Sequence, residues 1–565
     1  MSKFGHIDYA IFAIYFVVVS CYGYWIYQRK KKKLENTTDF FLAEGKLTWW
    51  AIGASLIASN ISAEQFIGMS GNGFSVGIAV AAYEWIAAVA LIIVAVWFMP
   101  IYLKNRIFTM PQFLKTRYNE SSSLIMAILW LLVYIVVNLT SILFLGTLAI
   151  NNLAGGGDFH TIEILMAVFA LVITLGGMKV IGYTDVIQVM VLIIGGLATT
   201  YVALNLVGER FGVGKDAIAG FNAMVQHAPN HFKMIMAKPG PHASQAYIDK
   251  YMILPGIAMY YAGEWIVNLN YWGCNQYITQ RALGAKLQTA RTGILFAGFM
   301  KLLMPLIVML PGIAAYVLYT HGGLSGPMAS GGKFNPDNAY SSILGFLPHG
   351  MRGLALAALT AAIVSSLAGK ANSISTIFTL DIYKKYIEPK ADEQRLVWIG
   401  RWVIVIAMVF SILLTWWDTM GIGRQGGFTY IQKYTGFISP GVFAIFILGM
   451  FWKRTTAAAS IVGIIGGVCL SIFFNQFAPL VFGNNTWLYT AYPDGQGHYY
   501  IPFLIAMGLA FAFTVIAMVA VSLAGPRISA KAFVIDKSMF KLKPNIIVMI
   551  VVTLVILCLL YIRFW

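Results

Sequence analysis

Charged residues are scarce in this sequence. Only 11% of its 565 residues are Asp, Glu, Lys or Arg, while 59% are hydrophobic. About a quarter of the residues of a typical soluble domain are charged, so this composition excludes a soluble protein. Apolar segments long enough to cross a bilayer recur from one end of the chain to the other. We therefore predict an all-α, multi-pass membrane protein whose residues 1–565 form a single transmembrane domain.

Cysteines and catalytic motifs are also scarce. The sequence contains no Walker loop, no zinc-ligand helix and no nucleophile elbow, so we expect that the protein is not an enzyme. Every cysteine falls in an apolar segment, which predicts buried free thiols and neither a disulfide framework nor a metal cluster. These cysteines are Cys21, Cys274, Cys469 and Cys558.

About fourteen segments are apolar enough to span a membrane. The first is not followed by a small-residue cleavage site, so we interpret it as a retained helix and not as a signal peptide. The predicted spans are residues 7–28, 49–73, 78–103, 122–151, 160–177, 183–207, 252–277, 290–319, 350–383, 398–417, 428–452, 455–480, 500–524 and 545–564.

The net charge of +17 comes mainly from loops that alternate along the chain. Basic residues cluster at 29–33, 104–117 and 527–543, for example, whereas loops 152–162 and 476–500 contain no Lys or Arg. By the positive-inside rule, this pattern places both termini outside the cell. It predicts a protein of the plasma (inner) membrane, surrounded by the lipid bilayer, with no nucleic-acid partner. Nothing in the sequence indicates an obligate protein partner.

Two predicted spans are interrupted by polar, helix-breaking residues. One interruption runs from Ser59 to Gly73 and the other from Asn268 to Gln276. Lipid offers no hydrogen bonds, so unwound backbone at membrane depth has to be buried in protein or line a cavity. Many transporters build a binding site near the bilayer midplane in this way. The interruptions lie in the second and seventh spans, and an odd offset reverses the membrane direction, which predicts matched halves of an inverted repeat.

Several polar residues lie within predicted spans. Glu84 and Lys301 together offer acceptors and donors to a neutral polyhydroxyl ligand, or they form a salt bridge with no role in binding. Ala362, Ser365 and Ser366 share one helical face. The two hydroxyls either help to cage a small cation or belong to a packing face of small residues, and spacing alone favours packing.

Three further polar side chains, Asp185, Gln65 and Gln432, also belong to predicted spans. Asp185 opens its span on the predicted cytoplasmic side, where it is either a relay for a cation or an acid near a helix N-terminus. Gln65 and Gln432 are amides in apolar surroundings, and each can both donate and accept a hydrogen bond.

Long stretches of the chain resemble the sodium/solute symporter family. The resemblance extends from about Phe40 to Thr455, and beyond that the chain matches mainly in hydropathy. The stretches that carry it are Gly53–Ala58, Asn60–Gly71, Tyr83–Trp85, Thr184–Val189, Tyr271–Gly273, Leu310–Tyr316, Ala361–Ala368, Asp381–Lys384 and Tyr430–Gly436.

The resemblance implies a leucine-transporter-like fold, with a five-plus-five inverted repeat, one extra helix before it and three after it. On this expectation, residues 7–28 form the extra N-terminal helix, 49–207 the first repeat and 252–452 the second. Residues 455–565 then form the C-terminal helices. The resemblance also implies Na+ as the coupling ion.

The resemblance implies roles for individual residues. Sugar-transporting members hold the sugar with side chains that match Gln65, Glu84, Asn268, Lys301 and Gln432. The sugar is covered from the inside by a match to Tyr271 and from the outside by matches to Met69, Tyr83 and Phe428. Sodium is held by carbonyls that match Ala58, Ile61 and Ala362 and by hydroxyls that match Ser365 and Ser366. The acid that matches Asp185 lies on the ion's inward path, and these matches favour cation binding over packing for the two serines.

Three positions depart from the sugar-transporting members. Ala87 replaces a serine of the pocket, and a missing hydrogen bond changes affinity by about 0.5–1.5 kcal/mol, which leaves the sugar class intact but puts galactose in doubt. Glu264 lies one turn before Asn268, at the expected outer edge of the pocket. Lys370 lies one turn beyond the serine pair, and we predict that it forms an ion pair with Asp185.

The expected function is sodium-coupled symport of a neutral, galactose- or glucose-like sugar into the cell by alternating access. Members that use two sodium ions carry a hydroxyl where this chain has Ala368, so we expect one Na+ per sugar. Glu84 disfavours a carboxylated solute, because it lies close to Lys301 in the expected pocket. The alternatives are symport of sialic acid, inositol, an amino sugar or an amino acid, or a membrane sensor or channel. Sensors of this family carry a cytoplasmic kinase region, and the sequence contains none.

Overall fold

The structure is a computed structural model that describes residues 5–30, 47–62, 64–153, 157–324, 329–330, 333–417 and 427–565. The protein is all-α, as predicted. Two small antiparallel hairpins join loops: β1 (Ala329–Ser330) pairs with β2 (Lys333–Phe334), and β3 (Tyr492–Pro493) pairs with β4 (Tyr499–Tyr500). Apolar sequence of this length favours helices because a helix satisfies its backbone hydrogen bonds within one segment.

Ten helices in the described part of the chain are long and apolar enough to cross a membrane. Four of the predicted spans are not among these ten: 49–73, 160–177, 252–277 and 428–452. Two of these four contain the polar interruptions, which divide them into pieces too short to span alone. The other two contain shorter apolar helices, Phe159–Thr174 and Ser439–Phe451. The count of fourteen therefore stays a prediction.

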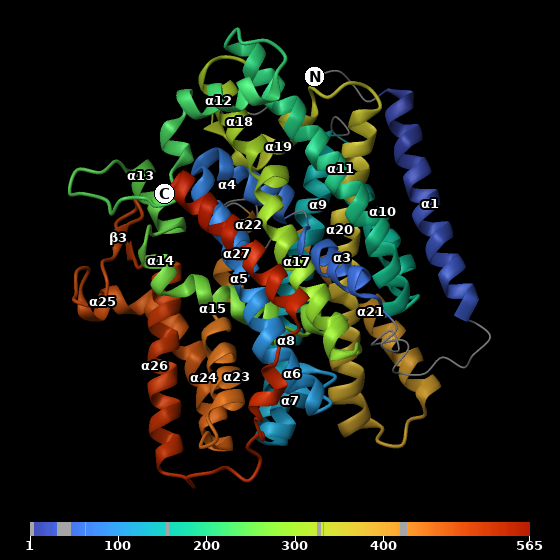
Figure 1. Ribbon diagram of the computed structural model, residues 1–565, viewed down its shortest axis with the longest axis vertical. Coiled ribbons are helices and arrows are strands. Elements are labelled where there is room, and N and C mark those ends of the chain that lie inside the picture. Colours follow the sequence, from blue (N-terminus) through green and yellow to red (C-terminus); the bar gives the residue numbers. More distant parts are fainter. Residues whose placement is uncertain are drawn as a thin grey trace.

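The helices of the first half begin with α1 on one flank of the molecule and continue into the centre (Figure 1). They are α1 (His6–Lys30), α3 (Trp49–Asn60), η2 (Glu64–Met69), α4 (Ser70–Ser75), η3 (Ile78–Ala81), α5 (Ala82–Ile93), η4 (Val94–Phe98), α6 (Met99–Lys104), α7 (Met110–Arg117), α8 (Glu120–Leu132), η5 (Val133–Leu139), α9 (Thr140–Leu153), α10 (Phe159–Thr174) and α11 (Met178–Arg210).

Short helices of the loop between the two predicted repeats precede the second half. They are α12 (Ala217–His227), η6 (Pro229–Phe232) and α13 (Gln245–Ile253). The second half contains α14 (Ala258–Tyr261), α15 (Gly263–Leu269), η7 (Asn270–Cys274), α16 (Gln276–Leu283), α17 (Leu287–Val308), α18 (Leu310–Thr320), η8 (Pro336–Asn338), α19 (Ala339–Leu344), α20 (Met351–Thr376), η9 (Ile377–Ile387), α21 (Glu393–Trp417), α22 (Gly427–Gly436) and α23 (Ser439–Phe451).

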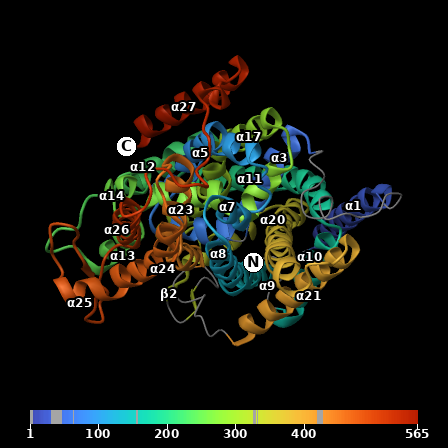
Figure 2. The same ribbon diagram turned by 90° about the horizontal axis from the view of Figure 1, so that it is seen from below.

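The C-terminal helices lie on the outside of the bundle, with α24 and α26 on the flank opposite α1 (Figures 1 and 2). They are α24 (Ala457–Ile472), η10 (Phe473–Phe477), α25 (Ala478–Phe482), α26 (Phe503–Leu523), η11 (Lys537–Phe540) and α27 (Pro544–Phe564). Their place at the edge agrees with their exposed apolar side chains, which face lipid in a membrane.

Helix α20 is the buried centre of the bundle. It packs against α3, α9, α10, α11 and α21, and nearly all of its residues are buried. Elements far apart in the sequence therefore meet on its surface. One of them is α3, the first half of the interrupted second span, which also packs against α11 and α17.

Both predicted interruptions are present. Helix α3 ends at Asn60, the chain turns to extended backbone at Ile61, and the π-helical turn η2 begins at Glu64. In the seventh span, α15 passes into the π-helical turn η7, which ends before extended backbone at Asn275. The breaks thus occur where the sequence places Ser, Asn and Gly among apolar residues.

Candidate functional site

Two side chains of the break accept hydrogen bonds from its backbone amides. The Gln65 side-chain oxygen accepts a hydrogen bond from the Ser62 amide at 2.9 Å. In a continuous helix that amide would bond the Ala58 carbonyl, so the bond to Gln65 releases this carbonyl from its helical partner. The Ser62 hydroxyl in turn accepts from the Glu64 amide at 3.1 Å. The break is therefore stabilised by its own hydrogen bonds, and it leaves carbonyl oxygens free to bind other partners.

Ser366 of α20 reaches these freed carbonyls. Its hydroxyl donates to the Ser59 carbonyl at 2.9 Å and lies 3.5 Å from the Ile61 carbonyl. Both ends of this contact are buried. One predicted cation ligand on α20, Ser366, therefore lies close to one predicted ligand of the break, Ile61, and the Ser59 carbonyl adds a third oxygen. Oxygen clusters of this kind suit small hard cations such as Na+.

Asp185 lies beside this cluster. Its carboxylate accepts hydrogen bonds from the Ser365 hydroxyl at 2.6 Å and from the Ser55 hydroxyl at 2.5 Å. The Arg281 guanidinium lies 3.9 Å from the same carboxylate and donates to the Ser55 hydroxyl at 2.8 Å. Gly369 makes room for Arg281, because a Cβ there would lie 2.5 Å from a guanidinium nitrogen. Asp185 is thus adjacent to Ser365, one of the predicted ion ligands.

The predicted ion pair between Lys370 and Asp185 is wrong. The Lys370 ammonium lies 3.8 Å from a carboxylate oxygen of Glu64 in η2. It also lies over the ring of Tyr277, 5.1 Å from the ring centroid. Arg281 is the cation that pairs with Asp185. The helical spacing correctly placed Lys370 one turn beyond Ser366, but it did not determine which acid the long side chain reaches.

Glu84 and Lys301 form a buried cluster at the end of α3. The Lys301 ammonium lies 2.5 Å from a Glu84 carboxylate oxygen and also donates to the side-chain oxygen of Asn60. Its distance to the Trp272 ring centroid is 5.2 Å. The salt bridge between Glu84 and Lys301 is therefore present, and Asn60 joins it from the last residue of α3. All three side chains are buried.

Asn268 bonds to its own helix. Its side-chain nitrogen donates to the backbone carbonyl and to a carboxylate oxygen of Glu264, both at 3.0 Å. This leaves the Asn268 oxygen as an acceptor for other groups. Within the described residues, the second carboxylate oxygen of Glu264 is buried without a hydrogen-bond partner. Glu264 also lies within electrostatic range of Glu84.

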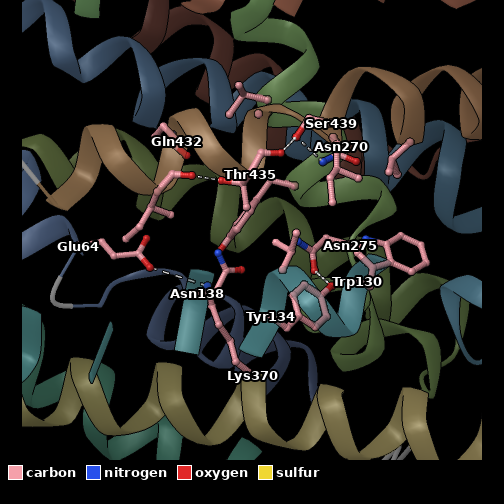
Figure 3. Close-up of a pocket in the computed structure, with 17 residues that line it drawn as sticks. Glu64, Trp130, Tyr134, Asn138, Asn270, Asn275, Lys370, Gln432, Thr435 and Ser439 are labelled. Atoms are coloured by element: carbon pink, nitrogen blue, oxygen red, sulfur yellow. Dashed lines mark hydrogen bonds and ion pairs between the residues drawn. The ribbon is translucent and has the colours of Figure 1, made fainter. Parts of the chain in front are cut away.

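Gln432 and Tyr271 line a polar cavity. Figure 3 shows Gln432, Glu64 and Lys370 around this space, with Asn138 between them. Tyr271 lines the same cavity and interacts with Asn60. It therefore lies between the cavity and the end of α3.

Three residues are predicted to cover the sugar from the outside, and the structure describes the side chains of two of them. Met69 ends η2 and is fully buried, and Tyr83 directly precedes Glu84 in α5 and is also buried. The side chain of Phe428 lies outside the described residues. The oxygen of Gln65, assigned to the sugar by resemblance, bonds to Ser62 within the break.

Four site neighbours had no role in the sequence prediction: Asn60, Ser55, Ser59 and Arg281. The first two lie in stretches that carry the family resemblance, so they were visible but had no assigned role. Arg281 lies just beyond the predicted span 252–277, yet its side chain is almost fully buried. Arg281 lies four residues after Tyr277, and its guanidinium carbon is 5.1 Å from the centroid of the Tyr277 ring. This helical spacing from an aromatic residue could have indicated that the Arg281 side chain points inward.

Comparison with known proteins agrees with this arrangement. The chain is 42% identical to the sodium/glucose cotransporter of Vibrio parahaemolyticus over the full length of both proteins. It is 32% identical to human sodium/myo-inositol cotransporter 2, over 82% of this chain and 69% of that protein. These relatives are transporters, so the chain is a transporter and not an enzyme.

Solved structures of low sequence identity share the fold. A Na+-coupled sialic acid symporter, in a substrate-bound outward-open state, aligns with a TM-score of 0.74 at 20% identity, over 93% of this chain and all of that one. A transporter of the nucleobase-cation-symport-1 family aligns with a TM-score of 0.50 at 15% identity, over 88% of this chain and 98% of that one. The sodium:solute symporter profile matches residues 40–467. The chain therefore belongs to the sodium:solute symporter family, a family of transporters that use sodium as the coupling ion.

Proposed function

We propose that the protein imports a neutral sugar together with sodium, with one ion per sugar. One observation carries this proposal: the end of α3 is shared by two clusters. Lys301, paired with Glu84, donates to Asn60, and Ser366 donates to Ser59 and lies close to Ile61. An ion and a solute that bind these clusters contact the same short segment. Coupling requires only that both ligands prefer the same conformation, and a shared segment supplies that condition.

The ion site in this proposal is formed by the break and α20. The carbonyls of Ala58, Ile61 and Ala362 and the hydroxyls of Ser365 and Ser366 would coordinate Na+. Five oxygen ligands would match the preference of a small hard cation for oxygen. Asp185, hydrogen-bonded to Ser365, would attract the ion along its inward path.

The solute site is proposed between α5, α15, α17 and α22. Glu84, Lys301, Asn268, Gln432 and Gln65 would contact the sugar, with Tyr271 covering it from the inside. Met69, Tyr83 and Phe428 would cover it from the outside. The cluster presents both donors and acceptors, which suits hydroxyl groups. A carboxylated solute would meet the Glu84 carboxylate beside Lys301, so a neutral solute is favoured.

The buried carboxylate of Glu264 favours one second candidate, an amino sugar. In the described part of the chain, its second oxygen has no hydrogen-bond partner, and an unpaired buried acceptor costs about 1–3 kcal/mol. A solute with an additional hydroxyl or amino group could satisfy it. Ala87 removes one hydroxyl from the proposed pocket, so the preferred sugar would differ from galactose.

The proposed architecture is about fourteen membrane-spanning helices, with 49–207 and 252–452 as inverted repeats, the extra helix 7–28 before them and the C-terminal helices 455–565 after them. Two observations support this division into repeats: a solved symporter structure shares the fold, and both interrupted spans are present. The alternating basic loops support a plasma-membrane protein with both termini outside. In that orientation Na+ enters from outside, binds the break and α20, and leaves after the inward site opens.

The driving force is sufficient for concentrative uptake. One charge moved across ~100 mV contributes about 2.3 kcal/mol. A tenfold sodium gradient contributes about 1.4 kcal/mol more. The sum, roughly 3.7 kcal/mol, corresponds to several hundredfold accumulation at one ion per sugar.

A competition experiment with a panel of solutes tests the proposed substrate class. Purified protein in liposomes is given an inward sodium gradient and a labelled hexose, with unlabelled galactose, glucose, myo-inositol, glucosamine or sialic acid as competitors. We expect neutral hexoses or glucosamine to reduce uptake and sialic acid to have little effect. Hexose uptake that is independent of the sodium gradient, or that sialic acid reduces as strongly as the unlabelled hexoses do, would contradict the sugar assignment.

A further inference from the structure

An ion pair within the bundle connects the broken helix to α20. The Lys370 ammonium of α20 lies 3.8 Å from a carboxylate oxygen of Glu64, the first residue of η2. Both side chains are buried, and the Tyr277 ring lies on one side of the ammonium. The distance is that of an ion pair and is longer than a direct hydrogen bond. We call Glu64 and Lys370 the latch pair.

The latch pair joins the same two elements as the proposed sodium ligands. Ser366 contacts the break directly, and Lys370 lies four residues further along α20, on the same helical face. Glu64 lies three residues beyond Ile61, whose carbonyl faces Ser366. Two contacts, one turn apart, therefore hold the break against α20. The ion pair does so without any sodium ion.

Separating the two charges of the latch pair costs free energy. Each charge, once unpaired in a dry interior, costs several kcal/mol unless water reaches it. The polar cavity of Figure 3 lies next to the pair, since both residues line it together with Asn138 and Gln432. Within the described residues, the Asn138 side-chain nitrogen and one Glu64 oxygen are buried and have no hydrogen-bond partner. These two polar atoms would form hydrogen bonds with water that enters the cavity when the pair separates.

We propose that the latch pair pre-assembles the sodium site by holding the break against α20. This inference rests on the proposed sodium site. An ion that binds only the assembled conformation has an apparent dissociation constant divided by the fraction of molecules in that conformation. The latch pair raises this fraction before sodium arrives. Its loss weakens sodium binding even though neither Glu64 nor Lys370 coordinates the ion, so both are positioning residues.

The test measures binding of 22Na+ to purified wild-type protein and to three variants. In E64Q/K370Q the pair becomes two neutral amides of similar size, which avoids leaving one buried charge alone. We expect the half-saturating sodium concentration to rise about tenfold, with the solute KM at saturating sodium changed less than twofold. The charge-exchange variant E64K/K370E should restore sodium binding at least partly. Lys433→Gln is the matched control, because it removes a half-buried lysine of α22 that contacts the Tyr500 ring and not the break.

The outcomes separate this inference from the proposed function. Failure of wild-type protein to bind 22Na+ would contradict the proposed sodium site, on which the latch depends. Sodium binding by E64Q/K370Q within twofold of wild type would overturn the latch while leaving the sodium site intact. A merely structural ion pair would reduce the yield of folded protein but leave the sodium affinity of the purified fraction unchanged. That result would also overturn the inference.

Discussion

Lys301→Ala is expected to lower sodium-driven sugar uptake at least about a hundredfold. The ammonium pairs with Glu84 and donates to Asn60, in a cluster that is closed to solvent. A hydrogen bond to a charged group contributes about 1.5–3 kcal/mol, so losing two of them accounts for an effect of this size. Uptake of the preferred sugar into proteoliposomes measures it, at saturating sodium and equal protein incorporation.

A neutral double variant separates solute binding from simple packing. Removal of Lys301 alone leaves the Glu84 carboxylate buried and unpaired, which destabilises a protein for reasons unrelated to its solute. E84Q/K301Q removes both charges and keeps a hydrogen-bonding pair of similar size. We expect this variant to bind 22Na+ and still fail to transport sugar. Near-normal sugar uptake by E84Q/K301Q would mean that the salt bridge is only structural and that the solute site lies elsewhere.

Ser366→Ala is expected to raise the half-saturating sodium concentration by tenfold or more. The hydroxyl lies at 2.9 Å and 3.5 Å from the Ser59 and Ile61 carbonyls, where α20 meets the break. Alanine removes one proposed oxygen ligand of sodium and leaves freed carbonyls facing a methyl group. A lost interaction of about 1.4 kcal/mol corresponds to a tenfold change in affinity. The sodium dependence of initial uptake rates measures this effect at a fixed sugar concentration.

The same helix provides a matched control for Ser366. Ser373 is buried on α20, but its hydroxyl donates back to the Gly369 carbonyl of its own helix at 3.0 Å. Ser373→Ala should therefore leave the sodium dependence within twofold of wild type. An equal effect of both substitutions would indicate that Ser366 acts through helix packing, as the spacing of the serines alone suggests.

The breaks could be predicted from sequence because their cause is local. Ser62 and Gln65 are three residues apart, and their hydrogen bonds within the break replace those of a continuous helix. Polar residues and glycines inside an apolar span indicate such a break without knowledge of the fold. The contact of Ser366 with the break could not be predicted from spacing alone, because the spacing of the serines equally fits a packing face. The family resemblance supplied that information, and the contact between Ser366 and Ser59 agrees with it.

The partners of long charged side chains could not be predicted in the same way. Lys370 was placed correctly on α20 but paired with the wrong acid, since Arg281 of α16 takes the position beside Asp185. Arg281 and Asp185 are far apart in the sequence, and nothing local indicates that they meet. Asn60 was missed for a similar reason: its contact with Lys301 depends on how α3 packs against α17.

The end of α3 gives the proposed coupling a physical location. Asn60 belongs to the cluster of Lys301, and the neighbouring Ser59 and Ile61 carbonyls belong to the contact with Ser366. Helix α17 supplies the first cluster and α20 the second. A movement of the break relative to either helix would change both clusters together. Sodium and sugar would then favour the same state without direct contact between them.

Simultaneous measurement of sodium and sugar fluxes tests this account most directly. Proteoliposomes are loaded with potassium, a membrane potential is set with valinomycin, and the initial uptake of 22Na+ and of the labelled preferred sugar is followed in one preparation. The account predicts that each flux depends on the other ligand, with one sodium ion entering per sugar and with sugar accumulating above its external concentration. Sugar accumulation that proceeds equally without sodium, or sodium entry that is independent of sugar, would contradict it.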